Sequence, residues 1–219
     1  MKLGLYGGTF NPIHLGHLKA AEEIIVSIGL DKICFVPSNI PPHKDDHFLI
    51  DGIHRFKMIK LSITNNDKFC VSDYEISRQD VSYTINTLRY FSKKYRDDEL
   101  FFIVGNDIFN EIETWKNYKS LFDLANFIVI IRPGFTEDFD YLPVALSEVF
   151  RYYEGDSEKA IYKNKSSKML IKLKIKGLKI SSSDIRNLAI DSKPIKNLVP
   201  PPVEEYILKH NLYNRGVQR

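Results

Sequence analysis

The stretch GGTFNPIHLGH, residues 7–17, lies between a short apolar run at residues 3–6 and an amphipathic run at residues 15–28. The first run predicts a β-strand, and the spacing of apolar residues in the second predicts an α-helix. The start of a helix leaves backbone N–H groups unpaired, and the helix dipole favours negative charge there. A strand, a glycine-bearing turn and a helix start therefore predict a cradle for phosphate groups.

Two histidines stand at this predicted helix start. His14 and His17 are three residues apart, so their side chains share one face of a helix. Gly16 between them has no Cβ that would obstruct a ligand approaching the backbone. Imidazoles in this position can donate hydrogen bonds to phosphate oxygens and stabilise the charge that develops during phosphoryl or nucleotidyl transfer.

Two other interpretations of these histidines compete with phosphate chemistry. Histidines three residues apart could bind zinc, but no cysteine or carboxylate lies at ligand spacing nearby. A purely structural helix start gains nothing from two polar imidazoles beside Gly7 and Gly8. The whole stretch closely resembles the GGTF(D/N)PxHxGH signature of the nucleotidyltransferase superfamily, whose core is HxGH, and this resemblance favours phosphate chemistry.

Composition narrows the class of protein. The 219 residues suffice for one substantial α/β domain. A net charge of +3 is too small to imply a nucleic-acid partner, and no apolar run is long enough to span a membrane. Cys34 and Cys70 lie in apolar runs, which is typical of small buried residues in a reducing compartment and not of a disulfide or metal pair. We therefore expect a cytoplasmic protein.

Further strand-like runs at residues 32–36, 69–72, 100–104 and 127–131 alternate with helical patterns. Near-continuous apolar runs are typical of strands covered on both faces, and the alternation predicts a Rossmann-like, doubly wound parallel sheet. In such sheets ligands bind at the carboxyl ends of the strands, where the first turn places His14 and His17.

Less regular features complete the expected fold. Asp51 is the expected N-cap of a helix over residues 53–63, with Ile53 on its apolar stripe, and Ser82 that of a helix over residues 85–95. The lysine-rich alternation within residues 163–179 predicts a surface or edge strand. Residues 38–50 and 134–167 show no regular pattern.

Polar segments lie where loops are expected to follow the strands. Residues 37–44 form either a rigid base for His43 and Lys44 or an ordinary proline turn. Residues 82–84 form either part of a site or a simple helix cap. Asp107 could accept a hydrogen bond from a ribose hydroxyl, hold Mg²⁺ or cap a helix.

Three more features leave alternatives open on their own. Trp115 could stack on a planar ring, although a single tryptophan is more often part of a core. Arg132 could lie against adenine, pair with phosphate or be a solvated loop charge. Residues 181–183 place three serines at a helix start with Arg186 one turn further on; capping needs one serine, so a second anion cradle is favoured.

Taken in order, these segments resemble one family, the bacterial nicotinate-nucleotide adenylyltransferases. The resemblance runs from residues 7–17 through PSNIPPHK, RFKM, SYT, GND, residues 114–115, RPG and ISSSDIR to residues 199–213. HxGH and ISSSxIR are motifs of the whole superfamily, whereas PPHK, SYT and the tryptophan segment resemble the nicotinate branch more specifically. The resemblance implies a Rossmann-like nucleotidyltransferase α/β domain over residues 1–219, with a small helical C-terminal part at about residues 181–213.

The resemblance also implies a reaction. ATP and nicotinate mononucleotide would give nicotinate adenine dinucleotide and pyrophosphate, a step of NAD biosynthesis. The phosphate of the mononucleotide would attack the α-phosphorus of ATP directly, so catalysis would be positioning plus charge stabilisation. Mg²⁺ would travel with ATP, and no dedicated metal site in the protein is expected.

The same resemblance assigns residues to this reaction. His14, His17 and Arg186 are the implied catalytic residues. The implied ATP-binding residues are Gly8, Thr9, Phe10, His14, Gly16, His17, Asp107, Arg132, Ser182, Ser183 and Arg186. The implied residues around the mononucleotide are Asn39, His43, Lys44, Thr84, Trp115 and Lys116.

Three other functions remain as alternatives. A sister transferase would act on nicotinamide mononucleotide or another phosphorylated acceptor. A nucleotide-binding sensor would keep the cradle without chemistry, although the intact His14, His17 and Arg186 argue against it. A zinc-binding regulator would use the two histidines as ligands. The expected partners are ATP and the mononucleotide, with no nucleic acid or membrane, and the sequence is compatible with a homo-oligomer.

Overall fold

The computed structural model describes residues 1–41, 48–78, 80–133 and 142–214. Its strands are β1 (Lys2–Gly8), β2 (Lys32–Pro37), β3 (Phe69–Val71), β4 (Glu99–Gly105), β5 (Asn126–Ile131), β6 (Arg151–Gly155), β7 (Lys159–Lys163) and β8 (Met169–Lys174). Its helices are α1 (Leu15–Ile28), α2 (Gly52–Ser62), α3 (Thr84–Lys94), α4 (Asn106–Phe109), the 3₁₀ turn η1 (Ile112–Thr114), α5 (Tyr118–Leu124), α6 (Val144–Ser147), α7 (Ser182–Ile190) and α8 (Pro201–Lys209).

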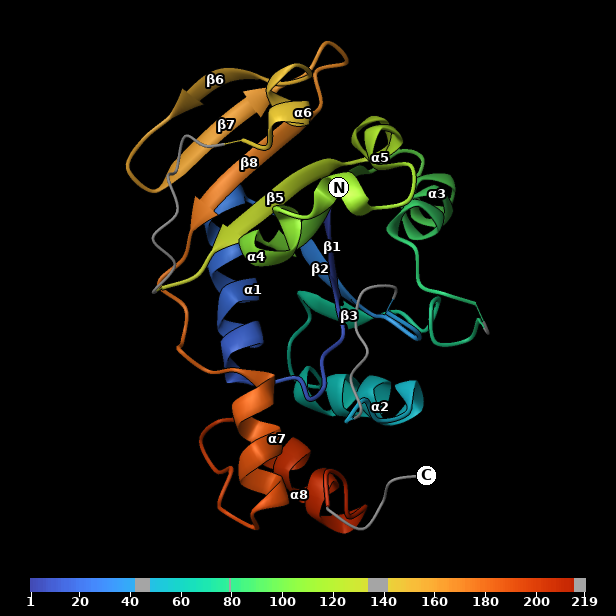
Figure 1. The fold of residues 1–219 in the computed structure, drawn as a ribbon, viewed down its shortest axis with the longest axis vertical. Coiled ribbons are helices and arrows are strands. Elements are labelled where there is room, and N and C mark those ends of the chain that lie inside the picture. The colour runs from blue at the N-terminus through green and yellow to red at the C-terminus, as the bar shows by residue number, and fades with distance from the viewer. Residues whose placement is uncertain (42–47, 79, 134–141, 215–219) are drawn as a thin grey trace.

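Within the described residues the strands form one eight-stranded sheet in the order β3-β2-β1-β4-β5-β8-β7-β6 (Figure 1). From β3 to β8 in this order, neighbouring strands are parallel, and β7 runs antiparallel to both β8 and β6. The predicted Rossmann-like α/β fold is therefore confirmed, with a short antiparallel extension. The chain moves outward from β1 to β3 and returns to β4 on the other side of β1, which leaves a topological switch point between β1 and β4.

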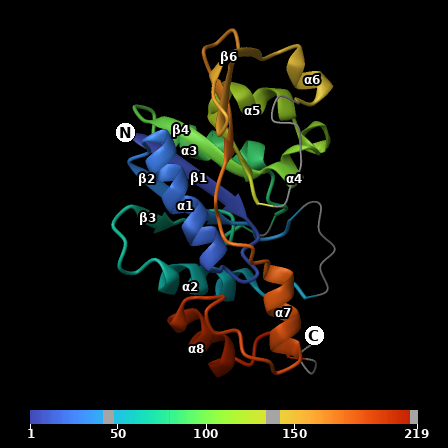
Figure 2. The ribbon, with the colours of Figure 1, turned by 90° about the vertical axis from the view of Figure 1, so that its left-hand side faces the viewer.

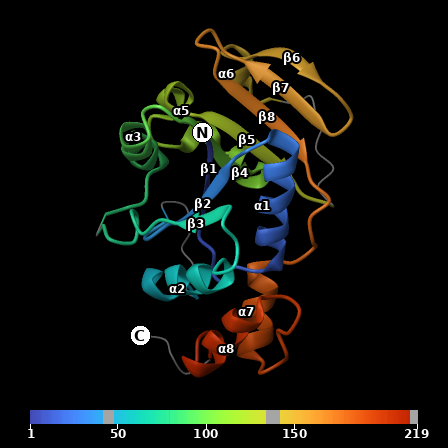
Figure 3. The ribbon, with the colours of Figure 1, turned by 180° about the vertical axis from the view of Figure 1, so that it is seen from behind.

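Helices cover both faces of the sheet. The apolar sides of α1 and α2 pack with those of α7 and α8 in one core cluster. Residues of α3, η1 and α5 form a second cluster against the opposite face. Figure 3, seen from behind, shows α1 lying across its face of the sheet, and Figure 2 shows α7 and α8 below the sheet, in the predicted C-terminal helical part.

The runs predicted as strands at residues 3–6, 32–36, 69–72, 100–104 and 127–131 correspond closely to β1 to β5. The predicted helix over residues 15–28 is α1. Residues 134–167 showed no regular pattern and led to no prediction, and their described part contains α6, β6 and β7. Short strands with exposed polar residues produced too little periodicity to be recognised.

The lysine-rich strand is also placed differently from the prediction. It is β8, which lies between β5 and β7 and not at an edge, and Lys172 on it is 2% exposed. Alternating side chains indicate the two faces of a strand but do not indicate how many neighbours it has. The edge strand at this side of the sheet is β6, all of whose residues are exposed.

The predicted helix caps had mixed outcomes. Asp51 caps α2 as expected, accepting a hydrogen bond from the Ile53 N–H at 2.8 Å. Ser82 does not cap α3: Tyr83 is the N-cap residue without a side-chain bond, and Ser82 Oγ instead accepts the N–H of Asn39 at 2.9 Å. The predicted apolar stripe of α2 is wrong at Ile53, which is 52% exposed.

Candidate active site

A pocket of about 850 Å³ opens at the carboxyl ends of β1 and β4, on both sides of the switch point. Elements distant in sequence contribute to its wall, among them α1, α3, α4, the residues that flank η1, and α7. Open α/β sheets bind ligands at this place because loops from both directions of winding meet there. Every implied ATP-binding residue lines this one pocket: Gly8, Thr9, Phe10, His14, Gly16, His17, Asp107, Arg132, Ser182, Ser183 and Arg186.

His14 and His17 cap the start of α1 for each other. The His14 Nδ1 accepts the backbone N–H of His17, and the His17 Nδ1 accepts the backbone N–H of His14, each at 3.3 Å. An Nδ1 that accepts a hydrogen bond carries no proton, so the proton of each ring is assigned to Nε2. The reciprocal cap thus uses the Nδ1 of each ring and not its Nε2.

Burial determines the charge of the first histidine. His14 is 3% exposed, and this burial, with the nearby positive charge of Arg132, lowers the pKa of its imidazole to about 3. His14 is therefore a neutral hydrogen-bond donor at physiological pH. His17 is half-buried, and its ring is held between the stacked His14 ring at 3.7 Å and the edge of Phe10 at 5.0 Å, measured between centroids.

Gly16 is required by the packing of the histidine pair. A Cβ at this position would lie 2.9 Å from His14 Nδ1 and 3.3 Å from the Leu178 carbonyl oxygen. Contacts that short would push the His14 ring out of its stacked position. The glycine therefore leaves room for the imidazole as well as for a ligand.

The start of α7 stands opposite the histidines. Ser181 caps the helix by accepting the Asp184 N–H at 3.1 Å, so the two serines that follow are not needed as caps. Ser182 donates to the Pro12 carbonyl oxygen at 2.9 Å, and this bond ties α7 to the loop that precedes His14. Arg186 donates to the Asn11 carbonyl oxygen at 3.0 Å. Hydroxyl and guanidinium groups thus gather beside the first helix start, as an anion site requires.

Two residues predicted separately on the adenosine side are in fact ion-paired. Arg132 Nη2 lies 2.9 Å from Asp107 Oδ2, and both side chains are 39% exposed. An exposed pair of this kind contributes little to stability. Its effect is to fix the two side chains at the mouth of the pocket, across the ends of β4 and β5.

The remaining predicted residues divide into three groups. Thr84, Trp115 and Lys116 line the same pocket, with Lys116 Nζ 4.3 Å from the centroid of the Tyr83 ring. Asn39 is not among the lining residues, and its side-chain Nδ2 donates to the Arg78 carbonyl oxygen at 2.7 Å. His43 and Lys44 lie outside the described residues.

Trp115 belongs to the core and to the pocket at once. Its ring packs edge-on against Phe102 at 6.2 Å between centroids, which satisfies the core interpretation. It also lines the pocket, and its buried Nε1 has no hydrogen-bond partner among the described residues. A buried donor without a partner is costly, so this Nε1 is suited to donate a hydrogen bond to a bound ligand.

Sequence reasoning missed two buried polar residues that shape the site. Arg55 is fully buried in α2 and donates to the carbonyl oxygens of Thr9 at 2.8 Å and Asn39 at 3.0 Å, joining the loops after β1 and β2. Glu75 is buried in the wall of the pocket. A charged residue among helical or loop positions is normally solvated, and only the apolar neighbours of Arg55 in α2, Met58 and Ile59, could have signalled its burial.

The described residues contain neither a cluster of metal ligands nor a membrane-spanning helix. No group of three or more histidine, cysteine or acidic side chains there could hold a metal ion. Among the same residues, no helix has both the length and the apolar character needed to cross a bilayer.

The chain is similar to known proteins over almost its whole length. A family model described as cytidylyltransferase-like matches residues 5–188. A protein of Geotalea uraniireducens named "Probable nicotinate-nucleotide adenylyltransferase" is 41% identical over 98% of this chain and 99% of its own length. One of the same name from Clostridium novyi is 39% identical over 97% of this chain and 98% of its own length.

The chain belongs to the nicotinate-nucleotide adenylyltransferase family. This assignment rests on the extent of the match as much as on identity, because the aligned region contains all of the motifs that form the pocket. The resemblance inferred from the sequence motifs is confirmed.

A solved structure agrees on the fold of the family. The nicotinic acid mononucleotide adenylyltransferase of Plasmodium falciparum, complexed with NaAD, superposes with a TM-score of 0.73 and 24% identity, covering 97% of both chains. At that identity the likeness concerns the fold alone.

Proposed function

We propose that the chain transfers the adenylyl group of ATP to nicotinate mononucleotide, forming nicotinate adenine dinucleotide and pyrophosphate. A phosphate oxygen of the mononucleotide forms a bond to the α-phosphorus of ATP, and the bond from that phosphorus to the bridging oxygen of the β-phosphate breaks. Pyrophosphate leaves with the electron pair. Both reacting groups come from the substrates, so the protein supplies position and charge stabilisation.

The observation that carries this proposal is the mutually capped pair of His14 and His17 at the start of α1, in the same pocket as Thr84 and Trp115. The Nε2–H groups of the pair suit the oxygens of a phosphate that gains charge as the reaction proceeds. Relatives that cover the whole chain carry the name of this activity, which supports the choice among nucleotidyl transfers.

Different parts of the pocket wall suit different parts of the two substrates. Arg186, with Ser182 and Ser183, suits the β- and γ-phosphates, which leave as pyrophosphate, because a guanidinium forms paired hydrogen bonds with phosphate oxygens. Gly8, Thr9, Asp107 and Arg132 suit the adenosine, and Thr84, Trp115 and Lys116 suit the pyridine of the acceptor.

We further propose that Mg²⁺ enters the pocket bound to ATP. Asp107, one of the acidic residues that line the pocket, is already ion-paired with Arg132, so it offers at most part of a coordination shell. Mg²⁺ is normally held by substrate phosphates and water with one or two carboxylates. Its contribution would be to neutralise charge on the phosphates.

The test is a comparison of acceptors. Purified protein is mixed with ATP, Mg²⁺ and either nicotinate or nicotinamide mononucleotide, and pyrophosphate and dinucleotide are both measured. We expect kcat/KM to favour the nicotinate form by roughly tenfold to a hundredfold, because an amide leaves donors in the pocket unpaired at a cost of about 1–3 kcal/mol each. Equal values or a preference for the amide would assign a sister reaction. Absence of pyrophosphate with either acceptor would leave a nucleotide-binding protein without this chemistry.

A further inference from the structure

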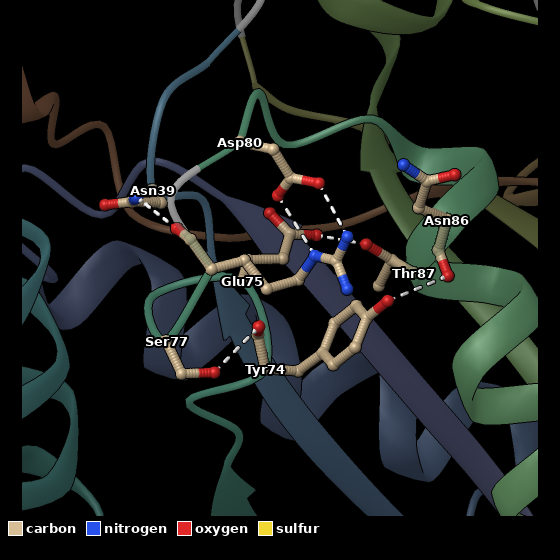
Figure 4. A network of polar contacts seen from close by, with 8 residues as sticks. Asn39, Tyr74, Glu75, Ser77, Asp80, Asn86 and Thr87 are labelled. Atoms are coloured by element: carbon tan, nitrogen blue, oxygen red, sulfur yellow. Dashed lines mark hydrogen bonds and ion pairs between the residues drawn. The ribbon is translucent and has the colours of Figure 1, made fainter.

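Glu75 is a buried acid that the proposed reaction does not use. It lies in the segment between β3 and α3, is 9% exposed and lines the pocket. Its carboxyl accepts a hydrogen bond from the Thr87 hydroxyl (Figure 4). Burial raises the pKa of this carboxyl, and the Thr87 and Ser82 hydroxyls oppose that rise.

Thr87, whose hydroxyl bonds to Glu75, lies near the start of α3. Ser82 precedes the N-cap residue of this helix, Tyr83. Tyr83 provides no side-chain cap, so this helix start lacks the usual bond that fixes the first turn. Glu75 supplies a substitute from another segment, and it leaves the backbone N–H groups of the helix start uncovered by a capping side chain.

The same segment is anchored on its other side to the loop that follows β2. Asn39 Nδ2 donates to the Arg78 carbonyl oxygen at 2.7 Å, and the Asn39 N–H donates to Ser82 Oγ at 2.9 Å. Figure 4 shows Glu75 inside this network, between Asn39 on one side and Thr87 on the other. The segment that carries Glu75 is therefore tied to the loop after β2 on one side and to α3 on the other.

The helix start that Glu75 fixes is part of the acceptor side of the pocket. Tyr83 and Thr84 line the pocket, and Lys116 extends over the Tyr83 ring from the opposite wall. The N-terminal end of a helix and the lysine each favour a negatively charged group, which suits the carboxylate of nicotinate.

We propose that Glu75 is a positioning residue for the acceptor, because its carboxyl holds the start of α3 through Thr87 so that the helix start faces the nicotinate group. This proposal rests on the proposed function. It assigns to Glu75 no contact with the reacting atoms and no role in binding ATP.

Thr87 allows the proposal to be tested away from the substrates. It is 1% exposed and is not among the residues that line the pocket. Thr87→Val keeps the shape of the side chain and removes the hydroxyl, and Thr87→Ser keeps the hydroxyl and removes a methyl group. If Glu75 acts through this bond, the KM for the acceptor must follow the hydroxyl and not the methyl.

The experiment measures kcat and both Michaelis constants for these two variants, for Glu75→Gln and for Tyr74→Phe. We expect Thr87→Val to raise the KM for nicotinate mononucleotide about tenfold, equivalent to about 1.4 kcal/mol, with the KM for ATP within about twofold of the unaltered protein. Thr87→Ser should stay close to the unaltered protein. Glu75→Gln should change in the same direction as Thr87→Val but less, because the amide oxygen can still accept the Thr87 hydroxyl while the charge that strengthens the bond is lost.

Tyr74→Phe is the matched control. It removes the 3.4 Å bond from the Tyr74 hydroxyl to the Asn86 carbonyl oxygen, which joins the same segment to the same helix without involving Glu75. We expect no change in either Michaelis constant.

The positioning role is excluded if Thr87→Val leaves the acceptor KM unchanged, if Thr87→Ser raises it as much, or if both Michaelis constants rise together. If Thr87→Val does not fold, the Michaelis constants of Glu75→Gln are compared with those of Tyr74→Phe, and the same criteria apply. Failure of the unaltered protein to form the dinucleotide would instead contradict the proposed function.

Discussion

The imidazole rings of His14 and His17 stack with their centroids 3.7 Å apart, and each Nδ1 accepts the backbone N–H of the other residue. In many helices a serine or threonine and a glutamate make this reciprocal cap. Here two imidazoles make it, so the bonds that stabilise the helix start also fix the orientation and the tautomer of both rings. Structure and proposed chemistry depend on the same two hydrogen bonds.

His17→Ala should lower kcat by a factor of about one hundred to one thousand, because it removes a donor directed at developing charge. It also removes half of the reciprocal cap, so we expect a loss of about 1 kcal/mol in the free energy of unfolding. Steady-state kinetics and urea denaturation measure the two effects. Lys19→Ala on the exposed side of α1 is the control and should change neither. Near-normal turnover of His17→Ala at saturating substrates would contradict the assigned role.

Arg186→Ala should raise the KM for ATP more than the KM for the acceptor, because the outgoing phosphates belong to ATP alone. Arg186→Lys keeps the charge but loses the planar fork, and we expect an intermediate KM for ATP. Lys193→Ala, which removes an exposed cation near the end of α7, serves as the control for net charge. An equal rise in both Michaelis constants would contradict the assignment of Arg186 to the outgoing phosphates of ATP.

Trp115→Ala should raise the KM for the acceptor about fivefold, because the pyridine would lose a stacking partner worth about 1 kcal/mol. Trp115→Phe keeps an aromatic ring but removes Nε1, which has no partner among the described residues. If a bound acceptor provides that partner, Trp115→Phe should also weaken acceptor binding, although less than Trp115→Ala. Isothermal titration with the mononucleotide measures both variants. Unchanged affinity in both would return Trp115 to a purely structural role against Phe102.

The parts of the fold and site that the sequence predicted are those set by local pattern. The continuous apolar runs and the helical period of residues 15–28 depend on near neighbours, so β1 and α1 could be recognised directly. Parallel strands then bring their carboxyl ends together, which explains why residues as distant as His14, Asp107 and Arg186 were expected in one place and line one pocket.

The parts that could not be predicted depend on contacts between distant segments. Ser82 had the right type and position for a cap, but the N–H of Asn39 competes for its hydroxyl. Glu75 and Arg55 look like solvated charges until the partners that satisfy them, such as Thr87 and the Thr9 carbonyl oxygen, are brought close by the fold. Local sequence pattern indicates on which element a polar residue lies, but only the tertiary structure determines which group it bonds to.

His14 should make the protein less stable as the pH falls below about 6.5, the pKa of an unfolded histidine. In the folded protein its pKa is lowered to about 3, so between these values the unfolded state binds a proton that the folded state does not. More protons bound by the unfolded state means that the free energy of unfolding falls with falling pH, by about 1 kcal/mol between about pH 7 and pH 5.5 for this group alone. His14→Asn retains a residue that caps helices well and cannot titrate. Urea denaturation of both proteins at the two pH values isolates the effect, since the other titrating groups are common to both. We expect the unaltered protein to lose about 1 kcal/mol more than the variant; parallel losses would show that His14 is not held neutral by burial.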